Sequence, residues 1–320
     1  MINTAIAAKP FTVIGGFLGA GKTTLLNHLL ASSDTGVRYA VLVNDFGAIN
    51  IDEQLIEQHD GKTLALSNGC ICCSMVGGFI NTMLDLMQQT DAFDHIIVEA
   101  SGVAEPEKIM DFARIDPALY PEGIVVMVDA GAIESQLADA QIENVVKAQL
   151  SSASILLLNK VDQTDPEPLQ RVKRLLEMHN PEAMVLECHN ALVSAALLFG
   201  HKLPVTDKAG IGRDKGGGIA SSEVTELPFE SHSIETQQAA ERERFELLRA
   251  KLPADIVRAK GLLRFSDDPE SAWLWQRTGG SDSLTRWRES TNRGCQLVFI
   301  ARGDITAAIA LVNELLPGTG

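Results

Sequence analysis

The chain has 320 residues, a formal net charge of −15, 45% hydrophobic residues and 22% charged residues. This length is enough for two domains with well-buried cores, and the composition excludes collagen-like, coiled-coil and wholly disordered proteins. The acidic balance argues against sequence-independent binding to nucleic acid and against docking on anionic membranes, because both need a basic surface.

The number and spacing of the cysteines, together with the N-terminal residues, indicate the cellular compartment of the protein. No apolar run reaches the length of a membrane span, and the first ten residues lack the pattern of a signal peptide. The five cysteines are an odd number, and three of them fall within residues 70–73, too close together for a disulfide framework. We therefore expect a cytoplasmic protein with neither a membrane nor a nucleic-acid partner.

Apolar runs alternate with helical patterns in the first two thirds of the chain. Runs that are apolar throughout are typical of strands buried on both faces of a parallel sheet. They lie at residues 11–14, 40–43, 96–98, 124–128, 155–158 and 184–186. Between them, residues 25–30, 134–150 and 166–179 have the spacing of covering helices. This alternation predicts an α/β domain with a mostly parallel sheet.

The composition changes at residues 210–222, where four glycines fall within positions 212–218. Such a segment predicts a flexible linker. Beyond it, residues 237–251 and 304–316 look helical, with Asp304 as the N-cap of the last helix, and residues 272–277 and 296–300 look like strands. We therefore expect an α/β domain over residues 1–209, a linker over 210–222 and a smaller α+β domain over 223–320.

A phosphate-binding motif stands where the first predicted strand meets a helix. Residues 16–24 match the P-loop pattern G-x-x-x-x-G-K-[ST]. Glycines let backbone N–H groups turn toward a phosphate, and the helix N-terminus adds positive charge. We expect Lys22 to reach the β- and γ-phosphates and the Thr23 hydroxyl to bind Mg²⁺. The nucleotide-binding residues predicted here are Gly16, Gly19, Ala20, Gly21, Lys22, Thr23 and Thr24.

A second motif predicts which base is bound. Asn159, Lys160 and Asp162 form Asn-Lys-x-Asp after a late apolar run. We expect the Asp162 carboxylate to accept hydrogen bonds from the ring N1–H and exocyclic amine of guanine, which adenine cannot offer. Asn159 braces the loop and the Lys160 stem stacks on the base. The motif therefore favours GTP over ATP, and a P-loop kinase or ATPase is the alternative.

Two carboxylates end apolar runs and could hold Mg²⁺. Glu99 is followed three residues later by Gly102, whose N–H could approach the γ-phosphate. For this reason we prefer Glu99 as the Mg²⁺ ligand. Asp129 ends another run in the same way and is read as a strand-end cap or a secondary contact.

Three cysteines are crowded after Asn-Gly. Cys70, Cys72 and Cys73 can converge on one soft metal ion, since thiolates favour Zn²⁺ or Cu(I), and Asp45 or a histidine could add a ligand. A redox thiol pair and a set of small buried residues remain as alternatives.

Together these residues resemble the metallochaperone-type GTPases of the CobW family, relatives of the GTPases that help insert nickel into hydrogenase and urease. The element at 69–73 is the most discriminating, because ordinary P-loop GTPases lack Gly-Cys-x-Cys-Cys. The segments that carry the resemblance cover most of the chain: 15–24, 43–47, 51–52, 69–73, 98–102, 128–130, 159–162, 258–261 and 296–300.

The resemblance implies slow GTP hydrolysis coupled to the binding of Zn²⁺, or of another transition metal such as Co²⁺, and to its delivery to an apo-metalloprotein client. It implies Lys22, Thr23 and Glu99 as the catalytic group. It further implies that the thiols of residues 70–73 ligate the metal near the nucleotide. A nucleotide-dependent homodimer is compatible with this reading.

The chain departs from the family pattern in two places. The usual Asn-Glu-Phe-Gly-Glu is replaced by Asn-Asp-Phe-Gly-Ala at residues 44–48, which shortens the first acid to Asp45 and removes the second at Ala48. The linker also lacks the histidines that many members carry. The alternatives within this reading are a nucleotide-gated zinc sensor or scaffold without metal transfer, and an accessory GTPase for cobalamin biosynthesis or for a nitrile hydratase.

Overall fold

The computed structural model describes residues 8–31, 37–43, 63–67, 76–199, 229–287 and 294–316. The chain divides into two compact units, one of Met1–Phe199 with Thr278–Ser281 and one of Gly200–Arg277 with Asp282–Gly320. The predicted linker lies outside the described residues, so the boundaries 1–209, 210–222 and 223–320 stay a prediction. In the described ranges, no helix combines the length and the apolar content needed to cross a membrane.

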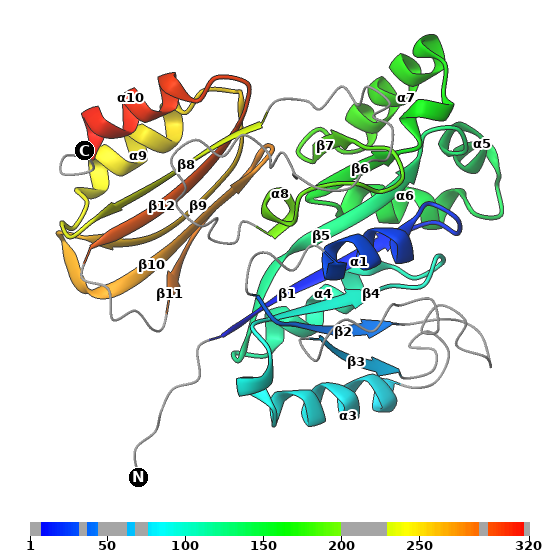
Figure 1. The fold of residues 1–320 in the computed structure, drawn as a ribbon, viewed down its shortest axis with the longest axis horizontal. Helices are drawn as coiled ribbons and strands as arrows, with labels where there is room; N and C mark the ends of the chain where they lie inside the picture. The colour runs from blue at the N-terminus through cyan, green and yellow to red at the C-terminus, as the bar shows by residue number, and fades with distance from the viewer. Residues whose placement is uncertain are drawn as a thin grey trace, which may run out of the picture. The chain divides into compact units, whose positions relative to one another are not determined.

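The first unit is an α/β domain built on a parallel sheet (Figure 1). Within the described residues the sheet has seven strands in the order β3-β2-β4-β1-β5-β6-β7, and neighbouring strands pair in parallel. The strands are β1 (Lys9–Gly16), β2 (Tyr39–Val43), β3 (Thr63–Ser67), β4 (His95–Glu99), β5 (Leu119–Asp129), β6 (Ile155–Asn159) and β7 (Met184–Glu187). The six predicted strands are all present, which confirms the α/β fold class, and β3 was not predicted.

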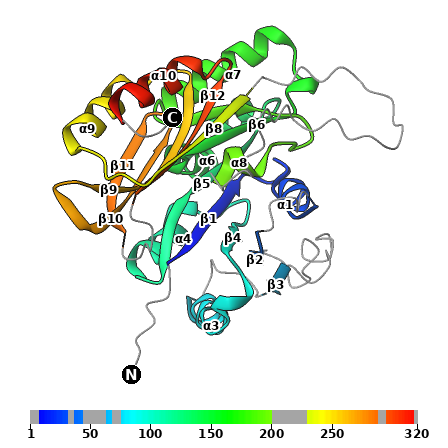
Figure 2. The same ribbon diagram turned by 60° about the vertical axis from the view of Figure 1, so that its left-hand side comes forward.

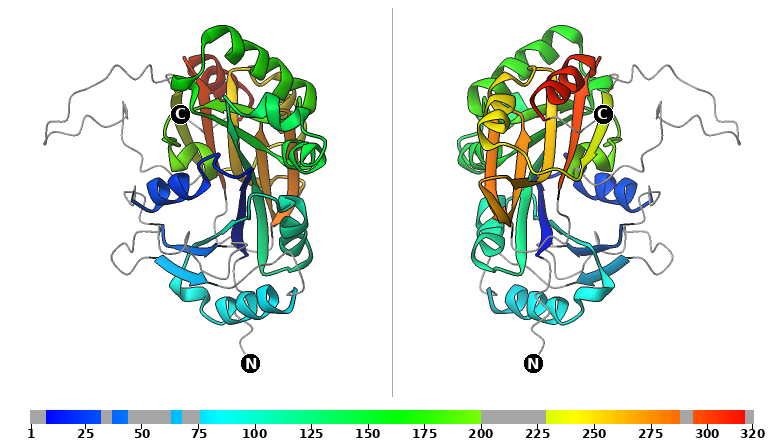
Figure 3. Two further views of the ribbon diagram at one scale, coloured as in Figure 1. Left: turned by 90° about the vertical axis from the view of Figure 1, so that its right-hand side faces the viewer. Right: turned by 90° about the vertical axis from the view of Figure 1, so that its left-hand side faces the viewer.

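Helices cover both faces of this sheet. The main core lies between the sheet and helices α3 (Val76–Met87), α4 (Pro106–Ile115), α6 (Glu143–Ser152) and α7 (Pro166–His179). Helices α1 (Lys22–Ala31) and α8 (Ala195–Phe199) also belong to this unit, and α1 lies on the opposite side of the sheet from α4 (Figure 3). Since the strands are buried on both faces, their residues are apolar at nearly every position.

The helix predicted over 134–150 is two helices. α5 (Ile133–Ala138) ends before Asp139, and α6 begins at Glu143. The Asp139 carboxylate accepts a hydrogen bond from the N–H of Gln141 at 2.9 Å, and its carbonyl accepts from Glu143 at 2.8 Å. This local turn competes with a continuous helix, as short acidic side chains often do.

The second unit is an antiparallel sheet with two helices on one face (Figure 2). In the described residues its strand order is β11-β10-β9-β12-β8, and β12 pairs antiparallel with β8 and β9. Its elements are β8 (Phe229–Thr236), α9 (Arg242–Lys251), β9 (Ile256–Phe265), β10 (Asp268–Thr278), β11 (Ser281–Trp287), β12 (Cys295–Arg302) and α10 (Thr306–Leu315). This is the smaller α+β part expected from the sequence.

Two helix starts in this unit differ from the prediction. α9 begins at Arg242 rather than at 237, because Ala240 pairs with the end of β9, donating to Arg264 O at 2.7 Å. α10 begins at Thr306 with Ile305 at the N-cap position. The Asp304 carboxylate still accepts a hydrogen bond from the Thr306 N–H at 2.8 Å. Hydrogen bonds from the Thr306 side chain and, to a smaller extent, from its backbone N–H lower the pKa of Asp304.

Candidate functional site

The phosphate-binding loop joins β1 to α1 at the carboxyl end of the parallel sheet. β1 ends at Gly16 and α1 begins at Lys22, so Gly19, Ala20 and Gly21 form the turn. Gly21 has φ +109°, and a Cβ there would lie 2.7 Å from the Asn159 amide nitrogen. Only glycine combines this conformation with so close an approach, which explains why the motif needs glycine at this position.

Lys22 lies over its own loop. Its Nζ donates to the Gly16 carbonyl at 2.9 Å and to the Phe17 carbonyl at 3.3 Å, and the side chain is buried. The positive charge is thus held at the mouth of the loop, beside the helix N-terminus whose N–H groups face the same space. This is the position from which an amino group could reach a bound phosphate.

Thr23 and Glu99 meet beneath the loop. The Thr23 hydroxyl donates to Glu99 Oε1 at 3.0 Å, across 76 residues of sequence, and Glu99 is only 3% exposed. Glu99 ends β4, which lies directly beside β1. Both groups offer hard oxygen ligands at one point, and this donor set suits Mg²⁺. The geometry therefore brings together the two residues predicted to hold the ion.

Asn159 ties the two nucleotide motifs together. It ends β6, is buried, and its amide nitrogen donates to the Ala20 carbonyl at 2.9 Å. Its Oδ1 accepts from the Ala191 N–H at 2.9 Å. The Asn-Lys-x-Asp segment is therefore fastened on one side to the phosphate loop and on the other to the turn after β7.

Lys160 and Asp129 form an ion pair at the ends of neighbouring strands. Lys160 has a left-handed backbone, with φ 61°, and its Nζ lies 2.6 Å from Asp129 Oδ2. The other carboxylate oxygen of Asp129 accepts from the Gly131 N–H at 3.0 Å. Asp129 therefore caps the end of β5, which is one of the two roles predicted for it from the sequence. It also restrains the Lys160 side chain. It lies away from the Thr23–Glu99 pair.

Asp162 is exposed in the turn after Asn159, where a base could reach its carboxylate. Next to it, Asn190 and Ala191 have φ of 48° and 55° in the turn after β7. Sequence reasoning did not single out this turn, because neither residue is a glycine and no motif marks it. The hydrogen bond from Ala191 to Asn159 is what brings it into the site.

Cys188, at the start of the same turn, is buried and its Sγ donates to Asn159 Oδ1 at 3.6 Å. Burial, with a smaller contribution from the negative charge of Asp162, raises the pKa of this thiol to about 12. The thiol is therefore neutral at physiological pH and acts as a packing group.

The predicted transition-metal residues lie outside the described part of the chain. They are Cys70, Cys72, Cys73 and Asp45, together with Ala48. The two flanking strands are described: β2 ends at Val43 beside β4, and β3 ends at Ser67 on the far side of β2. β2 and β3 therefore both end at the carboxyl end of the sheet, where Glu99 also lies.

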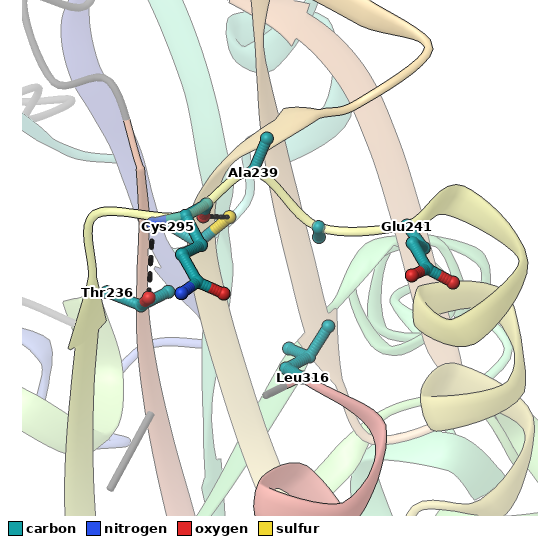
Figure 4. Close-up of a pocket in the computed structure, with 7 residues that line it drawn as sticks. Thr236, Ala239, Glu241, Cys295 and Leu316 are labelled. Atoms are coloured by element: carbon teal, nitrogen blue, oxygen red, sulfur yellow. Dashed lines mark hydrogen bonds between the residues drawn. The ribbon is translucent and has the colours of Figure 1, made fainter. Parts of the chain in front are cut away.

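A small pocket of about 80 Å³ lies in the second unit (Figure 4). Cys295 and Thr236 line it, and the Cys295 Sγ donates to the carbonyls of Gln238 and Arg264, each at 3.5 Å. Burial raises the pKa of this thiol as well. The thiol is committed to backbone acceptors, so we assign the pocket no chemistry.

Two buried polar residues near Glu99 were also not predicted. Gln149 on α6 donates to the carbonyls of Gly102 and Ala104, and the Ser101 hydroxyl is buried with no hydrogen-bond partner in the described part. Gln149 stands three residues after Val146, on the buried face of its helix. A polar residue at an apolar-face position was the available signal.

Both units match known families. Residues 10–187 match the nucleotide-binding domain of the CobW/HypB/UreG family, and residues 229–314 match the C-terminal domain of the cobalamin synthesis protein CobW. The chain is 30% identical to the zinc chaperone CobW of a Sinorhizobium species, over 93% of this chain and 94% of that protein.

Other relatives carry similar names. The chain is 26% identical to the zinc-regulated GTPase metalloprotein activator 1 of Dictyostelium discoideum, over 84% of this chain and 66% of that protein. Among solved structures, the Zn(II)-bound YjiA GTPase of Escherichia coli is 21% identical with a TM-score of 0.47, covering 96% of this chain and 99% of that chain.

Proposed function

Since this chain belongs to the CobW/HypB/UreG family of P-loop GTPases, we propose that it is a metal chaperone whose GTP hydrolysis is coupled to the binding of Zn²⁺ and to its delivery to an apo-metalloprotein. The observation that carries the nucleotide half of this proposal is the Thr23–Glu99 hydrogen bond beneath the phosphate loop. The metal half is supported by the three clustered cysteines and by the zinc named in the relatives.

Each nucleotide group is assigned to a described residue. Gly16, Gly19, Ala20, Gly21 and Thr24 line or follow the phosphate loop, and Lys22 moves from its two loop carbonyls to the β- and γ-phosphates. Thr23 and Glu99 would hold Mg²⁺, which would supply positive charge beside the phosphate oxygens. Gly102 lies on the loop after Glu99 and offers its N–H to the γ-phosphate.

The guanine base is assigned to Asn159, Lys160 and Asp162. Asp162 is exposed and can accept from the two N–H donors of guanine, whereas Asn159 is buried and bonded to the Ala20 carbonyl and the Ala191 N–H. Lys160, restrained by Asp129, presents its aliphatic stem to the face of the base. Catalysis by such a site is mostly positioning and electrostatic stabilisation.

The zinc is assigned to Cys70, Cys72 and Cys73, with Asp45 as a further ligand. β2 and β3, which precede these residues, end at the same sheet edge as Glu99. We propose that GTP binding orders these segments and that loss of the γ-phosphate relaxes them, which changes the affinity for metal. The cytoplasmic location and a nucleotide-dependent homodimer remain part of the proposal.

The deciding experiment measures Zn²⁺ affinity by competition with a chromophoric chelator, with GTP–Mg²⁺, with GDP–Mg²⁺ and without nucleotide. Cys72→Ser should lose the site, and Cys295→Ser, which alters a buried thiol bonded to backbone carbonyls, is the matched control. A shift of about tenfold between nucleotides corresponds to a coupling of about 1.4 kcal/mol. Equal affinity in all three states contradicts the proposal.

Two further arms separate the alternatives. Transfer of labelled zinc to an apo-metalloprotein should be faster with GTP than with GDP, and equal rates would favour a zinc sensor or scaffold that delivers nothing. Repeating the titration with Co²⁺ tests the metal, since ligand type alone does not separate the two ions. Lys22→Ala should abolish every nucleotide-dependent effect, and retained GTP turnover in that variant would refute the P-loop assignment.

A further inference from the structure

The loop between β4 and α4 is held from behind by one buried amide. Gln149 on α6 is 2% exposed, and its Nε2 donates to the Gly102 carbonyl at 3.1 Å and to the Ala104 carbonyl at 2.9 Å. The turn is closed by the Ala104 N–H, which donates to the Ser101 carbonyl at 3.0 Å. The directions of the Ser101, Gly102 and Ala104 carbonyls are therefore fixed.

The directions of these carbonyls also set the directions of the backbone N–H groups that follow them. The peptide bonds are trans, so each N–H points opposite to the carbonyl of the residue before it. The Gly102 N–H points away from the Ser101 carbonyl, and the Val103 N–H points away from the carbonyl that Gln149 holds. Within the described ranges, neither N–H donates to a protein acceptor.

The loop lies directly against the phosphate loop. A Cβ on Gly102 would lie 2.5 Å from Leu18 Cδ2 and 2.8 Å from the Leu18 nitrogen, so only a glycine backbone fits there. Gly102 is buried, and the neighbouring Ser101 hydroxyl is buried with no hydrogen-bond partner among the described residues. Buried donors without acceptors are costly and rare in folded proteins. Their concentration here, beside Lys22 and Glu99, indicates an anionic ligand.

We propose that Gln149 is a positioning residue for the γ-phosphate of bound GTP. By holding the Gly102 carbonyl, it keeps the Val103 N–H directed at the terminal phosphate. By holding Ala104, whose N–H donates to the Ser101 carbonyl, it also steadies the turn that directs the Gly102 N–H. This inference rests on the proposed GTPase function and deepens it. GDP lacks the γ-phosphate, so Gln149 sets the preference for GTP over GDP and the rate of hydrolysis, and it leaves binding of the base and of the β-phosphate unchanged.

The test compares two buried side-chain amides: Gln149, which is part of α6, and Asn180, which bonds the end of that helix. Gln149→Met keeps the length of the side chain and removes the donor. The control is Asn180→Leu, because Asn180 Nδ2 donates to the carbonyls of Leu150 and Ala153 at 2.8 and 2.9 Å, at the carboxyl end of the same helix, and not to the loop after β4. Both variants lose buried hydrogen bonds and both should unfold at a lower temperature, so stability alone does not separate them.

The readouts are the dissociation constants of a non-hydrolysable GTP analogue and of GDP, with Mg²⁺, and kcat at saturating GTP. In Gln149→Met we expect the preference for the analogue over GDP to fall about tenfold, the size of one lost hydrogen bond to a charged group, with a parallel fall in kcat and unchanged GDP affinity. Asn180→Leu should keep all three values. An unchanged preference in Gln149→Met, or an equal loss in both variants, overturns the proposal.

A measurement on the wild-type protein covers the case in which Gln149→Met does not fold. Amide hydrogen exchange at Gly102 and Val103 should be slowed by the GTP analogue and not by GDP, and equal protection by both overturns the proposal. If the wild-type protein neither prefers the analogue over GDP nor hydrolyses GTP, the proposed function fails first. If it does both and the variants behave alike, only the role of Gln149 fails.

Discussion

The side-chain amide of Asn159, at the end of β6, donates a 2.9 Å hydrogen bond to the carbonyl of Ala20, 139 residues earlier in the phosphate loop. The same side chain accepts from the Ala191 N–H. One buried amide thus connects the phosphate loop, the base-recognition segment and the turn after β7. The conformation of the phosphate loop is therefore coupled to the segment that selects the base.

Replacing Asn159 with Asp should weaken GTP and GDP binding to the same degree, because the carboxylate cannot donate to Ala20 and repels its carbonyl. The free energy of unfolding should fall by about 1–3 kcal/mol, the cost of an unsatisfied buried carbonyl. Denaturant titration and calorimetric binding measure the two effects. Asn180→Asp is the control: it should lower stability and leave both nucleotide affinities unchanged, and unchanged affinities in Asn159→Asp would contradict the coupling.

Replacing Asp129 with Asn should weaken both nucleotides modestly by freeing the Lys160 side chain. The pair is 2.6 Å long with side chains 32% and 17% exposed, so a loss of about 1 kcal/mol at most is expected. That corresponds to a few-fold rise in Kd for GTP and GDP alike, larger at low salt. The control is Asp94→Asn, which breaks the Arg38 ion pair at the opposite end of the sheet strands. Equal effects of the two substitutions on Kd would refute a role of Asp129 at the base.

Replacing Glu99 with Gln should separate binding from hydrolysis. The Thr23–Glu99 pair supplies the oxygens that suit Mg²⁺, so GTP turnover should fall by about 100-fold or more, the scale seen when a group that stabilises transition-state charge is removed. GDP should still bind when Mg²⁺ is chelated. Phosphate release gives the rate, and Glu107→Gln on the exposed face of α4 should leave it unchanged. Turnover within a few-fold of the wild-type rate would remove Glu99 from the site.

Much of the fold follows from local patterns. The continuous apolar runs predicted six strands of the parallel sheet, because strands buried on both faces cannot alternate with polar residues. Helix boundaries were predicted less well. Asp139 divides the helix expected over 134–150, and pairing of Ala240 with β9 delays α9 by five residues. The first is a competing local turn and the second is a tertiary hydrogen bond, which a local pattern does not encode.

In the candidate site, too, some residues could be predicted from local motifs and others depend on tertiary contacts. Lys22, Thr23 and Asn159 stand in motifs whose spacing carries the chemistry, and the structure brings them together as those motifs require. Gln149 and Ala191 contact residues far away in the chain, and neither stands in a sequence motif. Gln149 could have been noticed only as a polar residue on an apolar helix face.

Replacing Ser101 with Ala should leave stability unchanged or raise it slightly. Ser101 is 5% exposed, and its buried hydroxyl has no hydrogen-bond partner in the described part of the chain, so removal of the hydroxyl relieves a desolvation cost. If the hydroxyl serves the terminal phosphate, GTP turnover should fall while GDP affinity is kept. Thermal unfolding and single-turnover hydrolysis test both halves. A destabilised protein with normal turnover would contradict both expectations and assign the Ser101 hydroxyl a purely structural role.

The Cys188 thiol should make stability depend on alkaline pH. Burial raises its pKa from the ordinary value of 9.0 to about 12, so the folded protein keeps this proton where the unfolded chain loses it. Its contribution to the free energy of unfolding is therefore complete below pH 9 and is lost as the pH rises from 9 toward 12. Denaturant titrations at pH 7 to 10.5 should show a steeper decline for the wild-type protein than for Cys188→Ala. Parallel declines would contradict the raised pKa.

The same thiol can report on nucleotide binding. Since Cys188 Sγ rests on Asn159 Oδ1, alkylation at pH 8 requires the turn after β7 to open. Bound GDP, which holds the Asn159 segment, should slow that labelling by about tenfold or more if binding closes the opening at saturating ligand. Mass spectrometry of the peptide containing Cys188 gives the rate, with Cys295 of the second unit as the internal reference. Labelling of Cys188 at the same rate with and without GDP would place this turn outside the nucleotide site.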